Sequence, residues 1–322
     1  RQPIALVGIE YRIPAKVQAT SWQDNFALRP AVKRDNWLSR TRTERDHSLS
    51  VGRLIIRKGD HVIQSLDETF RIGSEARSPV IVSHHKVQGK NNFGRSVETL
   101  NHIDDHLHGH HHGIAFDVYP YVASSTVLKE DSIRLSERVL ITWSKSRPDL
   151  AGRELSDIAD ELGCDIFSAA AQLQPAGAVY FAMAEEDVQR ILSHPNAMIG
   201  SDGLPHDEHP HPRLWGTFPR VLGHYCRDLK LFSLEEAIRR MTGYSAETFG
   251  LIDRGVLKEG AFADITIFDE DTVLDRATFD KPMTPAAGID TVMVNGSVVW
   301  EHGCATGNRP GHVLRHGGNR PN

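Results

Sequence analysis

Short apolar runs alternate with amphipathic stretches from about Gly59 to Gly250. The runs lie at residues 80–82, 114–116, 139–141, 178–181 and 198–199. Before the first run, Val62, Leu66 and Phe70 recur at four-residue spacing, which places all three on one face of a helix. This alternation of buried strands with amphipathic helices is typical of βα units that build a parallel sheet.

Two further patterns predict local structure. Ser233 and Glu236 have the spacing of a capping box, and Gly243 is placed for a C-terminal cap, so we expect a helix over residues 234–242. After about residue 251 short strands and turn residues dominate, and Asn295-Gly296 between two apolar runs is a strong hairpin signal. The sequence predicts a small β domain over residues 251–322, with a loose tail after Gly303.

Residues 1–58 follow neither period convincingly, apart from a short apolar run at residues 4–7, and we leave them unassigned. A (β/α)8 barrel usually takes ~250 residues, whereas the readable βα region spans only residues 59–250. We therefore expect an α/β fold that carries the second half of an incomplete (β/α)8-type barrel. The first residue is Arg1 rather than Met, which suggests a fragment or a processed chain.

Composition narrows the class of protein. A net charge of -5 over 322 residues leaves no broad cationic surface, so a nucleic-acid partner is not expected. Cys164, Cys226 and Cys304 lie far apart, which favours neither a disulfide framework nor a zinc finger. The cysteine usage fits a reducing compartment, so we expect a cytoplasmic protein. No apolar run reaches membrane-spanning length, so we also expect it to be soluble and not to bind membranes.

Polar residues at strand exits are the candidates for chemistry, because catalytic groups of βα-barrels sit at the C-terminal ends of strands. Run 80–82 leads to His84, His85 and Lys86, where imidazole can ligate zinc and an ammonium can hold an anion. Run 198–199 leads to Asp202, a possible metal ligand and proton acceptor, and then to Arg213, which can grip a carboxylate. The alternatives are hydrogen-bonded loop histidines, a turn aspartate and a surface ion pair.

Two other groups are weaker candidates. Tyr119 and Ser125 follow run 114–116 and offer hydroxyl donors, although a buried tyrosine usually packs with its hydroxyl satisfied locally. A histidine tract, which we expect to be a solvated loop with adventitious metal affinity, comprises His106, His108, His110, His111 and His112.

These motifs closely resemble those of the N-acyl-D-amino-acid deacylases, or D-aminoacylases, of the amidohydrolase superfamily. The matching stretches include residues 59–73, the Ser-His-His-Lys segment 83–86, residues 92–96, 117–121, 141–143 and 173–178, the Ser-Asp-Gly-Leu-Pro-His-Asp segment 201–207, and residues 215–220 and 260–264. The resemblance implies a metal-bearing βα-barrel beside a small β-sandwich. The implied reaction releases a carboxylic acid and a free D-amino acid from a small acyl amino acid.

The resemblance also implies residue roles. It carries His84 over as a zinc ligand, and Asp202 as a metal ligand and the general acid/base. Contacts to the substrate carboxylate are carried over to Lys86, Tyr119, Ser125 and Arg213. The family's His-X-His and cysteine ligands have no counterpart in residues 1–58, and a further histidine ligand falls at about Leu54. The zinc site is therefore expected to be incomplete.

Two alternatives remain open at this point. The first is a cyclic-amide hydrolase of the same superfamily, which would not need Arg213 and Lys86 to converge on a carboxylate. The second is an incomplete family member without turnover. A panel of cyclic imides and acyl amino acids separates the two enzymes, and the zinc content per chain identifies the inactive form.

Overall fold

The computed structural model describes residues 4–6, 52–54, 59–107, 113–205 and 207–314. Most of the unassigned segment 1–58 therefore lies outside the described residues. So do His108, His110, His111 and His112 of the histidine tract. The boundaries proposed at residues 58 and 250 stay predictions.

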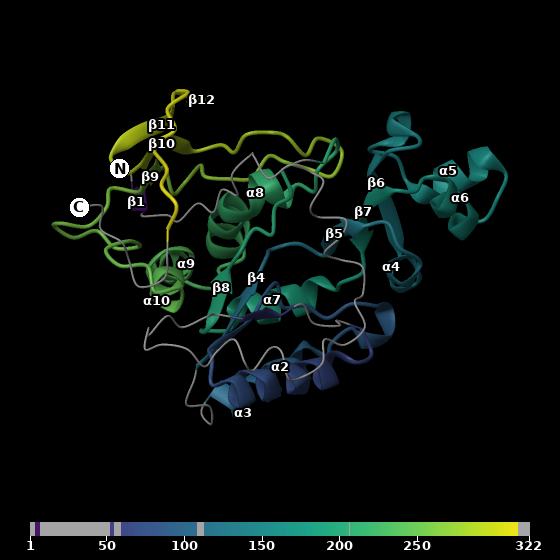
Figure 1. Ribbon diagram of the computed structural model, residues 1–322. Coiled ribbons are helices and arrows are strands. Elements are labelled where there is room, and N and C mark those ends of the chain that lie inside the picture. Colours follow the sequence, from purple (N-terminus) through teal and green to yellow (C-terminus); the bar gives the residue numbers. More distant parts are fainter. Residues whose placement is uncertain (1–3, 7–51, 55–58, 108–112, 206, 315–322) are drawn as a thin grey trace.

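A parallel sheet of four strands forms the centre of the molecule (Figure 1). Its strands, in the order β2-β3-β4-β8, are β2 (Gly52–Leu54), β3 (Val80–Val82), β4 (Ile114–Val118) and β8 (Ala197–Ile199). The βα rhythm is thus confirmed for runs 80–82, 114–116 and 198–199. Over the described residues the sheet has half the strands of a closed (β/α)8 barrel.

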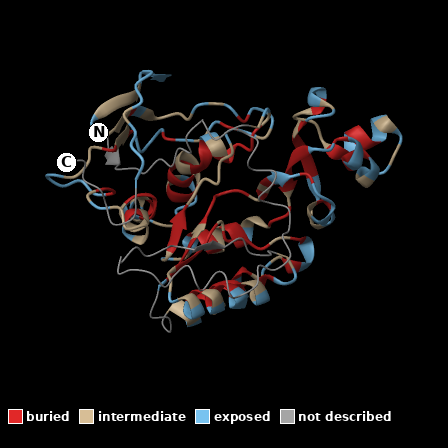
Figure 2. Ribbon diagram, in the orientation of Figure 1, coloured by how far each residue is buried: buried red, intermediate tan, exposed pale blue. Residues whose placement is uncertain are grey.

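Three helices cover one face of this sheet: α2 (Val62–Ala76), α3 (Ser96–Leu107) and α7 (Glu185–Ser193). Leu66 and Phe70 of α2 are fully buried, as the four-residue spacing predicted. They belong to one apolar cluster with Val82 of β3 and Phe116 of β4. On the other face, Ile81, Ala115 and Met198 form a separate buried cluster. Figure 2 shows this concentration of buried residues along the central strands.

The apolar runs 139–141 and 178–181 do not belong to the parallel sheet, and this part of the barrel prediction is wrong. They lie in an antiparallel sheet of order β5-β7-β6 that stands to one side of the molecule (Figure 1). Its elements are β5 (Ala123–Val127), β6 (Arg138–Ser144), β7 (Ala176–Phe181), α4 (Glu130–Leu135), η2 (Pro148–Leu150), α5 (Leu155–Leu162) and α6 (Ile166–Gln172). This subdomain has an apolar cluster of its own.

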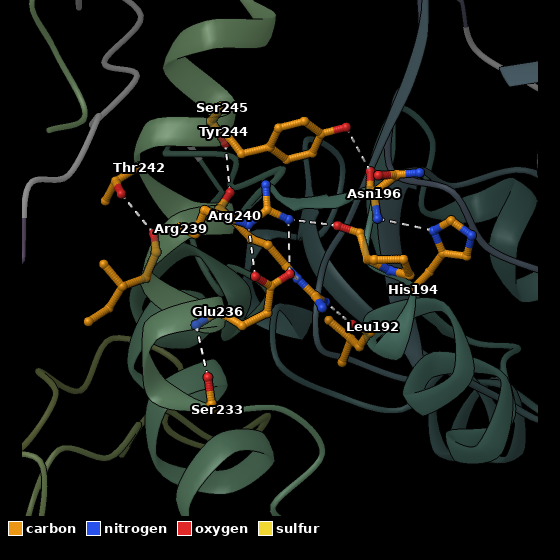
Figure 3. A network of polar contacts seen from close by, with 12 residues as sticks. Leu192, His194, Asn196, Ser233, Glu236, Arg239, Arg240, Thr242, Tyr244 and Ser245 are labelled. Carbon is orange, nitrogen blue, oxygen red and sulfur yellow. Dashed lines mark hydrogen bonds and ion pairs between the residues drawn. The ribbon is translucent and has the colours of Figure 1, made fainter. Parts of the chain in front are cut away.

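After β8 the chain forms α8 (Arg213–Arg220), the π-helical η3 (Val221–Asp228), α9 (Leu234–Met241) and α10 (Gly243–Thr248). The Ser233 hydroxyl accepts the Glu236 N–H, which confirms the N-cap of α9. The Glu236 side chain binds Arg239 and Arg240 instead of completing a capping box (Figure 3). The hydrogen bond from Arg239 is the main cause that lowers the pKa of Glu236 to about 2. Gly243 begins α10, so its predicted role as a cap is wrong.

The same arginines attach α9 to the segment before β8. Arg240 donates to the Leu192 carbonyl oxygen (Figure 3), and Arg239 donates to that of Pro195 at 2.8 Å. These contacts fix the position of β8, the strand that leads to Asp202.

A five-stranded antiparallel sheet of order β1-β9-β10-β11-β12 confirms the β pattern at the C-terminal side. Its strands are β1 (Ile4–Leu6), β9 (Ile265–Phe268), β10 (Ile289–Val294), β11 (Ser297–Glu301) and β12 (Cys304–Ala305). Asn295 and Gly296 connect β10 to β11 with φ angles of 47° and 78°, as the hairpin prediction requires. Unexpectedly, β1 pairs with β9, and β12 lies in the predicted tail. Among the described residues, no helix is both apolar and long enough to traverse a lipid bilayer.

Candidate functional site

The predicted site residues His84, Lys86, Tyr119, Ser125, Asp202 and Arg213 are connected by a chain of direct contacts. Arg213, at the start of α8, is only 1% exposed, and its Nη1 atom lies 3.0 Å from Oδ2 of Asp202. Its Nη2 atom donates to the carbonyl oxygen of Ser125 at 3.3 Å. Arg213 is thus a buried cation that joins the exit of β8 to β5, and the surface ion pair considered above is wrong.

His84 and Asp202 both adopt left-handed backbone conformations, with φ angles of 46° and 48°. Such conformations are costly for non-glycine residues and persist where neighbouring groups hold them. The His84 N–H donates to Oδ1 of Asp117 at 2.7 Å, and the His84 carbonyl oxygen accepts from Lys86 Nζ at 2.8 Å. Asp117 is therefore a positioning residue for His84.

Gly200 explains how β8 comes so close to that carboxylate. A Cβ atom at position 200 would lie 3.0 Å from Oδ1 of Asp117, so a larger residue would fit only if the carboxylate moved by a few tenths of an ångström. A glycine after β8 thus lets the backbone approach Asp117, the residue that positions His84, without a tight contact.

Two cations lie close to the ring of Tyr119. Lys86 Nζ is 4.5 Å from the ring centroid, and the guanidinium carbon of Arg213 is 4.7 Å from it. Such contacts stabilise cations that have lost part of their hydration. Burial raises the pKa of Tyr119, and the charge of Arg213 acts in the opposite direction, so the phenol keeps its proton at neutral pH.

Several polar atoms at this site are buried without a hydrogen-bond partner among the described residues. They include the hydroxyls of Tyr119 and Ser125 and Nε of Arg213. Buried polar groups are nearly always paired in folded proteins, and each exception calls for an explanation such as a catalytic role or a bound water or ion. Two hydroxyl donors and a guanidinium N–H therefore make this region suited to an anionic oxygen ligand.

His211 holds the backbone of Arg213, a role that the sequence analysis did not identify. Its Nδ1 accepts the Arg213 N–H at 3.0 Å, so Nε2 carries the proton and donates to the Ala123 carbonyl oxygen, also at 3.0 Å. Burial lowers the pKa of His211 well below its usual range, and the charge of Arg213 lowers it further. The imidazole is therefore neutral in the folded protein.

The described side chains do not complete a catalytic zinc site. Such a site needs about three protein ligands. Within the described ranges, neither His84 nor Asp202 belongs to a group of three potential ligands whose ligand atoms lie within 4.8 Å of one another. His85, the neighbouring alternative, is buried, and its Nε2 lies 3.0 Å from the hydroxyl of Thr99. His206 lies outside the described residues.

The backbone register places residue 54 at the C-terminal edge of the parallel sheet, where β3 also ends. Leu54 pairs with Val82, two residues before His84, so a ligand at this position would stand beside the exit of β3. A leucine side chain offers no ligand atom. That a ligand is missing at Leu54 stays a prediction.

Comparison with known proteins reveals extensive similarity. Residues 161–300 match the model of the Amidohydrolase family. A D-aminoacylase from Alcaligenes xylosoxydans xylosoxydans is 55% identical over 257 residues, which are 80% of this chain and 53% of the relative. An N-acyl-D-aspartate deacylase from the same organism is 46% identical over 81% of this chain and 52% of its own length. The chain thus spans about half the length of these curated relatives.

Solved structures agree with the sequence matches. A crystal structure of a D-aminoacylase superimposes with a TM-score of 0.77 at 54% identity, over 80% of this chain and 54% of that one. An N-acyl-D-glutamate deacylase from Bordetella bronchiseptica, solved with zinc and a phosphonate mimic of the tetrahedral intermediate, gives a TM-score of 0.77 at 47% identity, again over 80% and 54% of the two chains. The fold of the matched part is therefore α/β and amidohydrolase-like.

Proposed function

We propose that this chain, which belongs to the D-aminoacylase family of amidohydrolases, carries the residues that bind and cleave N-acyl-D-amino acids. The reaction is hydrolysis of the acyl amide to a carboxylic acid and a free D-amino acid. The observation that carries the proposal is the buried Arg213, whose guanidinium contacts both Asp202 and the Tyr119 ring. An anion held there lies beside the proposed proton-transfer group.

Recognition of the substrate carboxylate is the first role of the site. Arg213 and Lys86 supply positive charge next to the ring of Tyr119, and the hydroxyls of Tyr119 and Ser125 supply further donors. The α-carboxylate of an acyl amino acid is separated from its amide nitrogen by a single carbon. Fixing that carboxylate therefore also fixes the scissile bond for attack.

Asp202 is the proposed general acid/base. Its carboxylate accepts a proton from the water that attacks the amide carbon, and the same proton then passes to the departing nitrogen as the C–N bond breaks. The left-handed backbone and the ion pair with Arg213 fix the direction of this carboxylate. Arg213 thus links carboxylate binding to proton transfer.

Zinc is the metal that we propose for this site, because a family member was solved with zinc. His84 and Asp202 are its proposed ligands in this chain. Two ligands are fewer than catalytic zinc sites use, so we expect the chain as it stands to bind zinc weakly and to turn over slowly.

The experiment compares N-acetyl-D-methionine, N-acetyl-L-methionine and cyclic imides as substrates of the purified chain with added zinc. We expect any hydrolysis to fall on the D-acyl amino acid and to disappear in Asp202→Asn, while the exposed control Asp280→Asn keeps it. Preferential cleavage of a cyclic imide would establish the alternative enzyme. Absence of hydrolysis of all the compounds, with less than one zinc bound per chain, would establish the incomplete, inactive alternative.

A further inference from the structure

A group of metal-binding side chains lies on the helical layer, away from the proposed active site. Asp67 of α2 and His102 and His106 of α3 place ligand atoms within 4.8 Å of one another. The two histidines are four residues apart and therefore share a face of α3, whereas Asp67 comes from the adjacent helix. His102 is 23% exposed and Asp67 55% exposed, so an ion can reach the group from solvent.

The two imidazoles are held in place by neighbouring groups. Nδ1 of His106 lies 2.8 Å from the His102 carbonyl oxygen, and because a carbonyl only accepts, Nδ1 carries the proton. The lone pair of His106 is then on Nε2, the arrangement found in metal-ligating histidines whose other nitrogen donates to a carbonyl. The buried ring of Phe70 packs against both imidazoles. Its centroid lies 4.5 Å from that of His106 and 5.8 Å from that of His102.

His102 and Asp67 already form a close pair, with 2.7 Å between Nε2 and Oδ1. We propose that Asp67, His102 and His106 form a binding site for a divalent first-row transition metal, distinct from the zinc site proposed at His84 and Asp202. The ion replaces the proton between His102 and Asp67, and water completes its coordination. Two nitrogens and one carboxylate oxygen suit Zn²⁺, Ni²⁺ and Cu²⁺ and disfavour Ca²⁺ or Mg²⁺.

The ligand set joins α2 to α3. Both helices pack on the parallel sheet, and a metal that binds only the folded arrangement stabilises it in proportion to occupancy. Metal binding at this group is therefore expected to raise the thermal unfolding temperature of the chain.

The test is a titration of the chelator-treated chain with Cu²⁺, followed by electron paramagnetic resonance. We expect one bound ion with two imidazole nitrogens in its signal. Its affinity should fall at least tenfold in His102→Ala and in His106→Phe, which keeps an aromatic ring against Phe70. The exposed histidine control, His302→Ala, should bind as the parent does.

A second variant, His110→Ala/His111→Ala/His112→Ala, separates this group from later histidines of the histidine tract, to which His106 itself belongs. Retention of the tightly bound ion in this variant, with its loss in His106→Phe, supports the proposal. The opposite pattern, or equal binding by all variants, would show adventitious binding by other histidines and overturn it. An unfolding temperature that rises with Zn²⁺ in the parent but not in His106→Phe completes the positive result.

Discussion

Arg213 Nη1 lies 3.0 Å from Asp202 Oδ2, so the cation proposed to bind the substrate carboxylate also contacts the proposed general acid/base. The two functions therefore depend on one another. The contact joins the beginning of α8 to the segment after β8, and Arg213 is almost completely buried. Changing Arg213 should consequently affect both substrate affinity and the chemical step.

Arg213→Lys tests this coupling. A lysine keeps the charge but loses the planar, two-point contact with carboxylates. We expect KM to rise at least tenfold, which is about 1.4 kcal/mol, and kcat to fall as well, with the metal content unchanged. The control is Arg276→Lys, an exposed substitution. Steady-state kinetics in which both parameters match the parent would restrict Arg213 to a structural ion pair.

His211 gives the stability of the protein a specific pH dependence. The pKa of His211 is lowered in the folded state, so the unfolded chain takes up a proton near pH 6.5 while the folded chain does not. The free energy of unfolding should therefore fall as the pH decreases below about 6.5, by at most ~1.4 kcal/mol per pH unit for this one group. The loss continues until the pH reaches the lowered pKa of the folded state.

Urea unfolding between pH 5 and 8 (about the range of histidine titration) measures this slope in the parent and in His211→Gln. The substitution should remove the contribution of one bound proton to the dependence of the free energy of unfolding on pH. His302→Gln, on an exposed hairpin, should leave it unchanged. Identical slopes in all three proteins would show that His211 is not a buried neutral imidazole.

Asp187 supports the segment that leads into α3. Its carboxylate accepts the N–H groups of Gly94 and Ser96 at 2.8 and 3.1 Å, and its side chain is only 2% exposed. Asp187→Ala leaves these donors without their acceptor, so the free energy of unfolding should fall by about 2–3 kcal/mol. Asp280→Ala, at an exposed position, is the matched control for the denaturation measurement. Equal stability of the two variants would mean that water replaces the carboxylate.

The proposed active site has only two proposed zinc ligands, His84 and Asp202, so we expect its zinc content to be low. We expect the His102→Ala/His106→Ala variant, dialysed against a mild chelator, to retain much less than one zinc per chain. Elemental analysis measures this quantity without a contribution from the helical group. Retention of one zinc that is lost in Asp202→Asn would mean that residues outside the described ranges complete the site.

The fold was predictable where local pattern decides it. Val62, Leu66 and Phe70 form the buried face of α2, and Asn295-Gly296 forms the hairpin turn, because both signals depend on residues close in sequence. The runs in β6 and β7 were placed in the wrong sheet. A short buried run has the same composition in a parallel or an antiparallel sheet, and its partner strand is chosen by tertiary packing.

For the site too, the sequence predicted residues marked by a local pattern and missed residues that act through distant contacts. The strand-exit rule brought His84, Lys86 and Asp202 to attention, and the structure joins them through contacts with Tyr119 and Arg213. The strand-exit rule did not identify Asp117 or His211. Asp117 acts through a hydrogen bond to a residue 33 positions earlier, and His211 through one to Ala123, 88 positions away. The position of His211 two residues before Arg213 was the only local sign of its role.

The binding of acid and ester forms of one substrate tests the proposed carboxylate site most directly. Calorimetric titration compares N-acetyl-D-methionine with its methyl ester and with the L enantiomer, in the parent and in Arg213→Lys. We predict that the D acid binds at least tenfold more tightly than its ester, about 1.4 kcal/mol, that it binds more tightly than the L acid, and that Arg213→Lys removes most of the preference for the acid. Equal affinities for acid and ester in the parent would contradict the assignment of Arg213 and Lys86 to the substrate carboxylate.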